Sequence, residues 1–441
     1  MLVNTLDRPV GARDLLRLAI PSAAFVVLTN AYRLVDQYWI QGVSTEAQAA
    51  VGSSIFVLLI FFAGGELIAA GLGPLVARAT GAGNDEERRR VLGTAIAGGA
   101  LCSVLVTVLG ASLAPWIAEI LGLEGQTAIE CTRYLRTLAL TVLPLFLTPL
   151  LDQCYLAMGL ARPPLLLHAL SVGLNLIITP VFVFHFGLGV VGAALAANLT
   201  RAVATVIGFW HLARLTGLSW SMVRIGPDFS RILRVGTPMA LGTVAYSLVY
   251  WAMLKTSISP LGPHINAALG IGFSALEGFT WPCFHGVSLA AASFVGRYLG
   301  AGRPDLARDA IRRAFPIVTG LGVLATLAFY FAGSFLTGIF TEDPAVHLAA
   351  TTYAAVLAGS QIFVAWEALA EGVLSGAGDT RAVFWWSMPF NLLRVPLAWL
   401  LAFPLGLGPA GVWWAINATT YMKALAKGLS VVRGRWATIQ V

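Results

Sequence analysis

The clearest shortage in this sequence is charge. Only 11% of its 441 residues are Asp, Glu, Lys or Arg, while 58% are hydrophobic. A soluble globular chain carries about 25% charged residues, because its surface must face water. This shortage and a mean hydropathy of +0.80 exclude a soluble multi-domain enzyme. We therefore expect most of the surface to face lipid.

Motifs for metal, redox or covalent chemistry are also missing. The four cysteines are scattered without metal-ligand or redox spacing, and no His, Ser or metal cluster is spaced as an active site. No Walker A pattern is present. We therefore predict that the chain is not an enzyme and needs no cofactor. No cleavable signal peptide is apparent, because several charges within residues 1–14 precede a full-length apolar segment.

The chain does contain a series of long apolar runs. A helix needs roughly 20 apolar residues to cross a bilayer, and twelve such stretches are separated by short breaks rich in Gly, Pro and charge. They lie near residues 15–39, 49–79, 92–119, 132–158, 164–186, 190–213, 232–256, 266–298, 311–340, 348–376, 383–404 and 409–431. We predict an all-α polytopic membrane protein with twelve transmembrane helices.

The net charge of +7 does not indicate a nucleic-acid partner. The basic residues lie mainly in short loops between apolar runs, where Lys and Arg set membrane orientation. A cytoplasmic N-terminus places most of them on the cytoplasmic side. The exceptions are Arg133, Arg136 and Lys255 outside, and Arg33, Arg201 and Arg394 within helices. We predict a multi-pass, monomeric protein of the inner (plasma) membrane with both termini cytoplasmic.

The two halves of the chain repeat each other. Gly81-Ala-Gly83 after Arg78 recurs 219 residues later as Gly300-Ala-Gly302 after Arg297. Further matches are Pro21 with Pro238, Asn175 with Asn391, Pro180 with Pro396, and Asn198 with Asn417. Six spans per half give parallel repeats, for which a substrate site lies near the midplane between the lobes. We predict an N-terminal lobe over 1–215, a cytoplasmic linker over 216–230 and a C-terminal lobe over 231–441. The two lobes are expected to be pseudo-symmetric, with six helices each, around a central cleft. The alternative is a duplication that only builds a stable bundle.

Several segments form a set with a family-like pattern. They are Pro21…Val35-Asp36-Gln37…Gly42 with Ala49-Ala-Val-Gly52, the two Gly-Ala-Gly turns, and Gly372-Val-Leu-Ser-Gly-Ala-Gly-Asp-Thr-Arg381. The set resembles the motifs of multidrug and toxic compound extrusion (MATE) transporters of the MOP flippase superfamily, at matching spacings over nearly the whole chain.

The resemblance implies export of drug-like, cationic or amphipathic organic compounds, by antiport with protons or sodium and by alternating access. The alternative on the same fold is a flippase for lipid-linked oligosaccharides or related lipids. Such a flippase predicts a cleft lined with arginines for a pyrophosphate, and this chain offers mainly Arg33, Arg201 and Arg394. A channel, recognisable by flux that does not saturate, is a further possibility.

The first coupling candidate is Asp36, at the position of the family's first-helix aspartate. A charged group inside a bilayer usually faces the protein interior or a wet cavity, so the resemblance implies a cation-binding or protonatable site. The alternative is a structural pair with Arg33 on the same helix face. The fifth helix of many relatives carries a second acid, but here the stretch reads Asn175-Leu-Ile-Ile-Thr179, so a hydroxyl replaces the charge.

The C-terminal lobe departs from the family pattern too. Ser247 and Val364 stand about where the NorM-like branch has acids, and this lobe instead offers Glu277, Glu367 and Glu371. Glu367 and Glu371 are four residues apart on one helix face, so their repulsion would hold one proton. They are candidates for a proton or cation site. The alternative is that one of them pairs with Arg394.

The remaining candidates would line the substrate cleft or act as hinges. Trp281 and Phe279 could bind flat cations through their ring faces, although most such aromatics are interface anchors. Glu66 and His285, at equivalent positions of the two lobes, are weaker candidates, as is Asp152; His168 and His185 rank lower. The helix-interior prolines Pro21, Pro238 and Pro282 are predicted bend points, with static kinks as the alternative.

Overall fold

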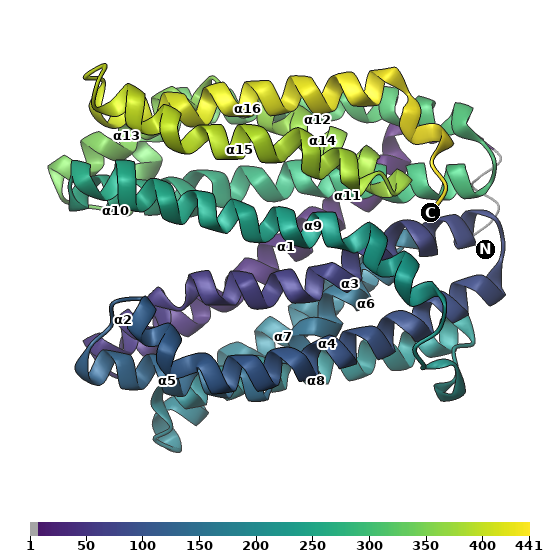
Figure 1. The fold of residues 1–441 in the computed structure, drawn as a ribbon, viewed down its shortest axis with the longest axis horizontal. Coiled ribbons are helices and arrows are strands. Elements are labelled where there is room, and N and C mark those ends of the chain that lie inside the picture. Colours follow the sequence, from purple (N-terminus) through teal and green to yellow (C-terminus); the bar gives the residue numbers. More distant parts are fainter. Residues whose placement is uncertain (1–7) are drawn as a thin grey trace. The chain divides into compact units, whose positions relative to one another are not determined.

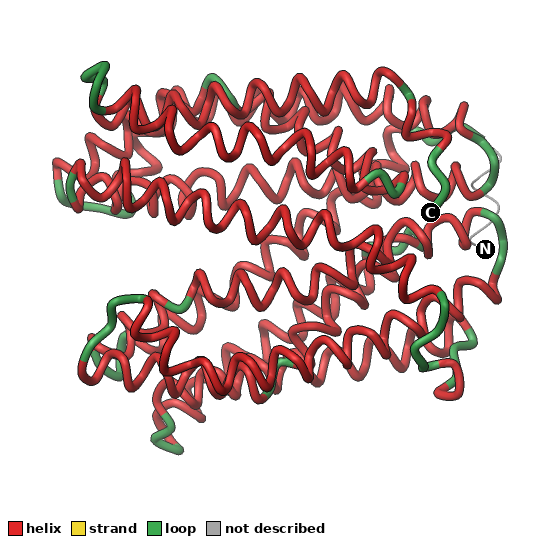
Figure 2. Tube along the Cα trace, viewed as in Figure 1, coloured by secondary structure: helices red, strands yellow, loops and turns green. Residues whose placement is uncertain are grey.

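The computed structural model describes residues 8–441, which fold into helices joined by short connections, with no β-strand in that range (Figure 1) (Figure 2). The first half contains α1 (Ala12–Ile40), α2 (Thr45–Ser53), α3 (Ile55–Gly81), α4 (Asp85–Ile120), α5 (Gly125–Leu140), α6 (Leu143–Ala157), α7 (Arg162–Pro180) and α8 (Gly189–Thr216). The second half contains α9 (Asp228–Met253), α10 (Pro263–Ile271), α11 (Gly278–Gly300), α12 (Pro304–Gly338), α13 (Pro344–Ala358), α14 (Gln361–Ala377), α15 (Thr380–Ala402) and α16 (Gly408–Arg433). Short π-helical segments follow three of them: η1 (Val181–His185), η3 (Leu254–Ile258) and η5 (Gly272–Glu277).

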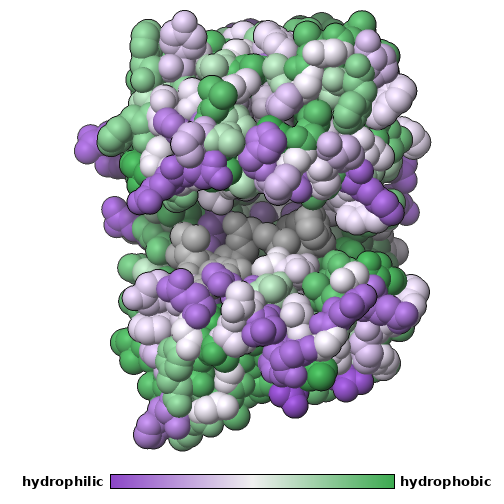
Figure 3. Space-filling view, turned by 90° about the vertical axis from the view of Figure 1, so that its left-hand side faces the viewer, coloured by the Kyte–Doolittle hydropathy of each residue, from purple (hydrophilic) through white to green (hydrophobic). Residues whose placement is uncertain are grey.

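Taken in order, these elements form twelve helical segments that correspond to the twelve predicted spans. Among the described residues, six helices are long and apolar enough to cross a membrane. Two more spans qualify as bent pairs, α5 with α6 at 53° and α13 with α14 at 60°. Hydrophilic residues gather on the face shown in Figure 3, which looks onto helix ends and connections. The prediction of an all-α polytopic membrane protein is confirmed.

The chain divides into two compact units. The N-terminal unit is Ala24–Ala240, and the C-terminal unit is Leu241–Val441 together with the residues up to Ala23. The boundaries of these units do not lie in the predicted linker over 216–230. The first part of α1 belongs to the C-terminal unit, and the first part of α9 belongs to the N-terminal unit. The chain passes between the units just after Pro21 and just after Pro238, inside helices.

The repeat seen in the sequence recurs in backbone geometry. α3 and α11 both end in a Gly-Ala-Gly turn, in which Gly83 and Gly302 have φ of 66° and 69°. The amide of the following residue closes each turn, from Asn84 to the Ala79 carbonyl at 2.9 Å and from Arg303 to the Tyr298 carbonyl at 2.8 Å. A left-handed residue of this kind commonly ends a helix, and glycine takes it without steric cost. The repeated glycines are therefore explained by the turn.

In the C-terminal unit, α11 and α14 approach closely through two glycines. A Cβ built on Gly372 would lie 2.3 Å from the Ser288 carbonyl oxygen, and one on Gly376 would lie 2.3 Å from that of Ala292. Small residues four apart let membrane helices pack backbone against backbone. This contact fixes α14, and with it the neighbouring Glu371, against α11.

Replacing Gly372 by Leu should therefore disrupt the C-terminal unit. No flexible side chain can yield to the new one, since the obstacle is backbone of α11, and we expect a loss of about 3 kcal/mol or more in the free energy of unfolding. The apparent melting temperature in detergent, followed by size-exclusion chromatography after heating, measures this loss. The control is Gly320→Leu, at an α12 position with no atom within 4 Å. Equal melting temperatures for the two variants would contradict the packing argument.

Candidate functional site

In the N-terminal unit, Asp36 is a buried carboxylate. It lies on α1 with 6% of its surface exposed, and its Oδ1 has no hydrogen-bond partner among the described residues. Arg201 of α8 is within electrostatic range of it. The guanidinium of Arg201 lies 3.9 Å from the centroid of the Tyr32 ring. The side chain of Arg33, the alternative partner for Asp36, lies outside the described residues.

Asn175 and Thr179 are both fully buried on α7. The Asn175 amide nitrogen donates to the Thr179 hydroxyl at 3.0 Å, and the Asn175 carbonyl oxygen has no partner within the described part of the chain. The residue that replaces the family's second acid therefore accepts a hydrogen bond from its neighbour one turn earlier. Coordination of an ion by this pair stays a prediction.

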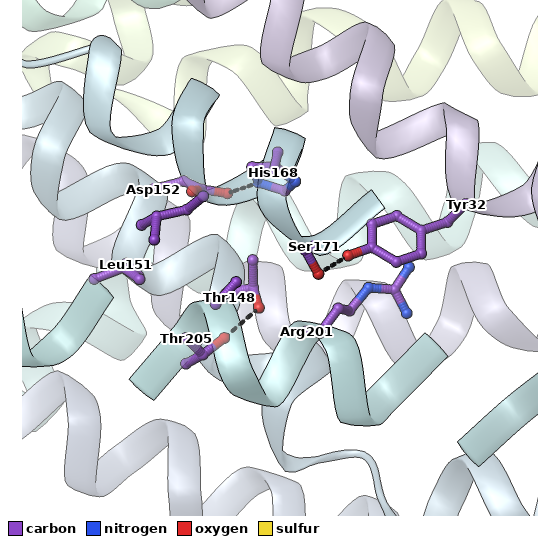
Figure 4. A pocket seen from close by; sticks show the side chains of 10 residues that line it. Tyr32, Thr148, Leu151, Asp152, His168, Ser171, Arg201 and Thr205 are labelled. Atoms are coloured by element: carbon purple, nitrogen blue, oxygen red, sulfur yellow. Dashed lines mark hydrogen bonds and ion pairs between the residues drawn. The ribbon is translucent and has the colours of Figure 1, made fainter. Parts of the chain in front are cut away.

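A polar pocket lies deeper in the same unit (Figure 4). It is lined by polar side chains from four helices, and its volume of about 10 Å³ is near the smallest that holds one water molecule. Drug-sized ligands occupy pockets of roughly 300–1,000 Å³, so this space suits an ion or water better than a drug. Its polar lining residues are Tyr32 of α1, Thr148 and Asp152 of α6, His168 and Ser171 of α7, and Arg201 and Thr205 of α8.

In the C-terminal unit, the carboxylate of Glu277 has a hydroxyl group as its hydrogen-bond partner. It ends η5, a π-helical segment of the kind often found at functional sites. The Tyr353 hydroxyl donates to Glu277 Oε1 at 2.6 Å, and no basic nitrogen among the described side chains lies within ion-pair distance of it. A Cβ on Gly272 would lie 2.4 Å from the Tyr353 ring, so that glycine lets the tyrosine reach the acid.

Arg394 of α15 is 2% exposed, and it is held by hydroxyl groups. Its guanidinium donates to Thr419 at 2.9 Å, to the Tyr250 hydroxyl at 3.1 Å and to Thr420 at 3.5 Å. It acts on Glu277 and Glu367 only at longer electrostatic range. The proposed pairing of Glu367 or Glu371 with Arg394 is therefore wrong as an ion pair.

The partners of these two acids are lysines of α16. Lys427 Nζ lies 2.9 Å from Glu367 Oε1 and 2.7 Å from Glu371 Oε2, and Lys423 Nζ lies 3.1 Å from Glu367 Oε1. The lysine side chains are 1% and 9% exposed. The sequence interpretation placed both lysines at a cytoplasmic helix end. The two lysines are four residues apart, as are the two acids, and this matching spacing is the sequence feature that could have predicted the pairing.

The residues predicted to line the substrate cleft lie on α3 and α11. The Trp281 ring stacks on His285 with centroids 5.5 Å apart, and Phe279 is 64% exposed on the C-terminal unit. Glu66 lies on α3 in the N-terminal unit. Whether these residues contact a substrate stays a prediction. Pro282 lies inside α11, whereas Pro21 and Pro238 precede the positions where the chain passes between units.

Two repeated units of apolar helices, with acidic side chains at membrane depth, are typical of a membrane transporter. The MatE family model matches residues 21–181 and 238–400. The chain belongs to this family, the multidrug and toxic compound extrusion transporters, and it is therefore a transporter and not an enzyme.

Named relatives cover nearly the whole chain. The multidrug export protein MepA of Staphylococcus aureus (strain N315) is 24% identical over 424 residues, which are 95% of this chain and 93% of that protein. The probable multidrug resistance protein NorM of Thermotoga maritima is 25% identical over 438 residues, covering 97% of this chain and 94% of that protein.

Solved structures share the fold. An outward-facing multidrug resistance MATE family transporter matches with a TM-score of 0.89 at 20% identity, covering 98% of this chain and 97% of that chain. A MOP superfamily transporter from Pyrococcus furiosus, described as having a binding pocket of reverse polarity that suggests a different function, matches with a TM-score of 0.90 at 19% identity and 97% coverage of both.

Proposed function

We propose that this transporter exports drug-like organic cations or amphipathic compounds from the cytoplasm, by antiport with protons or sodium and through alternating access. The observation that carries the proposal is one carboxylate in each unit without an ion-pair partner among the described side chains, the buried Asp36 and the half-buried Glu277. A buried carboxylate must bind a proton, a metal cation or an organic cation to be neutral. Competition between those ligands is what antiport requires.

The names of the relatives support the substrate class. Multidrug export is the printed role of MepA in Staphylococcus aureus, and multidrug resistance that of NorM in Thermotoga maritima. We infer the inner (plasma) membrane with both termini cytoplasmic, since the Arg- and Lys-rich loops favour that orientation. Transport in this scheme needs the coupling ion and the substrate but no further cofactor. We propose a monomer, because a single chain contains both carboxylates.

The test is transport into proteoliposomes of a panel of organic cations, beginning with ethidium, under separate pH and sodium gradients. We expect one gradient to drive accumulation and Asp36→Asn to reduce it at least tenfold, because an amide carries no negative charge and takes up no proton. Glu342→Gln, on an exposed connection, is the control. Wild-type protein that moves no cation under either gradient would refute the proposal, and an Asp36→Asn variant equal to wild type would remove Asp36 from it.

The alternative is a flippase for a lipid-linked oligosaccharide. It needs cationic side chains free to hold a pyrophosphate. Lys423 and Lys427 instead face carboxylates, and Arg394 is bonded to hydroxyl groups, which favours cation export. Movement of a fluorescent lipid pyrophosphate between leaflets, with no ethidium transport, would favour the flippase.

A further inference from the structure

We propose that Asp152 and His168 form a proton-binding dyad in the N-terminal unit and that this dyad supplies the coupling proton site that Thr179 cannot provide. The proposal rests on the antiport function proposed above, and it commits that function to protons. Neither residue belongs to the motifs that carry the family resemblance, and both rank low among the candidates that the sequence offers.

The two side chains are in direct contact and shielded from solvent. His168 Nε2 lies 2.8 Å from Asp152 Oδ2 across the α6–α7 pair, and the residues are 6% and 7% exposed. Asp152 Oδ1 is buried, lines the pocket and has no hydrogen-bond partner among the described residues. The carboxylate thus has one oxygen on the histidine and one left for an ion or water in the pocket.

Both ring nitrogens of His168 face oxygen atoms that can accept a hydrogen bond. The Thr29 hydroxyl donates to the Phe25 carbonyl at 3.0 Å, which leaves its oxygen free to accept from His168 Nδ1 at 3.4 Å. The other ring nitrogen faces the carboxylate. A histidine with acceptors at both nitrogens is fully satisfied only when both carry hydrogen, which is the imidazolium. Loss of one proton would leave one contact without a hydrogen.

The dyad is connected through the pocket to Asp36. Ser171, one turn after His168 on α7, accepts a hydrogen bond from the Tyr32 hydroxyl, and Arg201 stacks on the same tyrosine ring (Figure 4). Arg201 is in turn within electrostatic range of Asp36. The polar groups of α6, α7, α8 and α1 therefore line the same pocket inside one unit, and Arg201 is the lining residue within electrostatic range of Asp36.

The charges of this series change with one proton. Asp36 and Asp152 are negative and Arg201 is positive, so the group carries one excess negative charge when His168 is neutral. Uptake of a proton at His168 Nε2, beside the carboxylate, makes the group neutral, and its release restores the negative charge. Because excess charge in a low-dielectric interior is costly, the deprotonated state attracts a cation and the protonated state releases it. One proton thus exchanges for one monovalent organic cation.

Other ionisable groups lie on the elements packed around the dyad. They include Tyr32 and Asp36 of α1, Glu66 of α3, Cys102 of α4, Cys154 and Tyr155 of α6, and Arg201 and His211 of α8. His211 contacts Tyr155 at 2.7 Å and is exposed. Histidine is the side chain that changes charge between about pH 5 and 8. His168 is the one histidine of this group that contacts a carboxylate.

The experiment measures ethidium binding to purified protein as a function of pH, alongside transport. In wild type, proton release and cation binding are linked, so the Kd should rise about tenfold or more between pH 8 and pH 6. In His168→Gln and Asp152→Asn this change should fall below about threefold, and pH-driven accumulation should fall with it. Exchange of labelled for unlabelled ethidium without a gradient should persist, which a merely structural role for the dyad would not allow. His211→Gln is the matched control and should keep the wild-type pH dependence.

Each other outcome has a definite meaning. A folded His168→Gln protein with the full pH dependence overturns the dyad while the antiport function stands. Accumulation driven only by sodium, with no pH effect on the Kd, also overturns the dyad and leaves antiport intact. Wild type that binds and moves no cation refutes the proposed function and this inference with it. If Asp152→Asn does not fold, the double variant with His168→Gln replaces it, and a pH dependence in that variant overturns the proposal.

Discussion

Replacement of Lys427 by Met is expected to lower the free energy of unfolding by about 3–5 kcal/mol, since removing one partner of a buried ion pair leaves uncompensated charge. Lys427 is 1% exposed and contacts both Glu367 and Glu371. Methionine keeps the length of the side chain but not the ammonium. The apparent melting temperature in detergent should fall by roughly 5–15 °C.

The chain provides its own control for this experiment. Lys255 lies beside the Trp251 ring and is exposed, so Lys255→Met should change stability by no more than about 0.5 kcal/mol. Adding Glu371→Gln to Lys427→Met should recover part of the loss, because it removes an unpaired carboxylate. If Lys427→Met and Lys255→Met have the same melting temperature, the cluster of α14 and α16 charges does not stabilise the C-terminal unit.

The same cluster limits what Glu367 and Glu371 can do in coupling. Two carboxylates that already face two ammonium groups have their charge balanced within the unit. Glu277 has only the Tyr353 hydroxyl, and Asp36 has an oxygen without a partner in the described chain. The balance of contacts favours Glu277 and Asp36 as ion sites, and Glu367 and Glu371 as a structural cluster.

Much of the fold follows from local pattern. Long apolar runs and the glycines of helix-ending turns depend on nearby residues only, so twelve spans and the internal repeat could be predicted from the sequence. Gly83 and Gly302 recur because both turns need a left-handed residue. By contrast, the placement of α1 and α9 across two units depends on packing between distant segments, which periodicity does not encode.

The site was harder to predict because its contacts are long-range. Glu367 and Lys427 are 60 residues apart and meet only because α14 packs on α16. Arg394 was the predicted partner of these acids, but its guanidinium is occupied by Thr419 and Tyr250. Asp152 and His168 are 16 residues apart across a turn between helices, so no helical spacing connects them. Residue type identified the acids, and packing decided which of them are paired.

Substitution of Glu277 by Gln should uncouple transport while leaving the C-terminal unit folded. Glutamine keeps an oxygen for the Tyr353 hydroxyl, which donates at 2.6 Å, but it carries no negative charge and does not take up or release a proton. A charge carried by Glu277 in addition to the proton at the dyad makes the exchange move one net charge, which contributes about 2.3 kcal/mol at 100 mV, so its loss should lower the accumulation ratio by up to about fifty-fold.

Two measurements separate this effect from damage to the fold. Ethidium accumulation under an imposed gradient should fall in Glu277→Gln, whereas gradient-free exchange and the melting temperature should stay near wild type. Tyr353→Phe keeps the acid and removes only the donor, so it should retain most of the accumulation and shift its pH dependence. Because Tyr353 also packs edge-on against Trp413 at 4.9 Å, phenylalanine preserves that contact and isolates the hydroxyl. Full accumulation in Glu277→Gln would mean that this carboxylate serves the fold of α10 and α11 and that the coupling ion binds in the N-terminal unit alone.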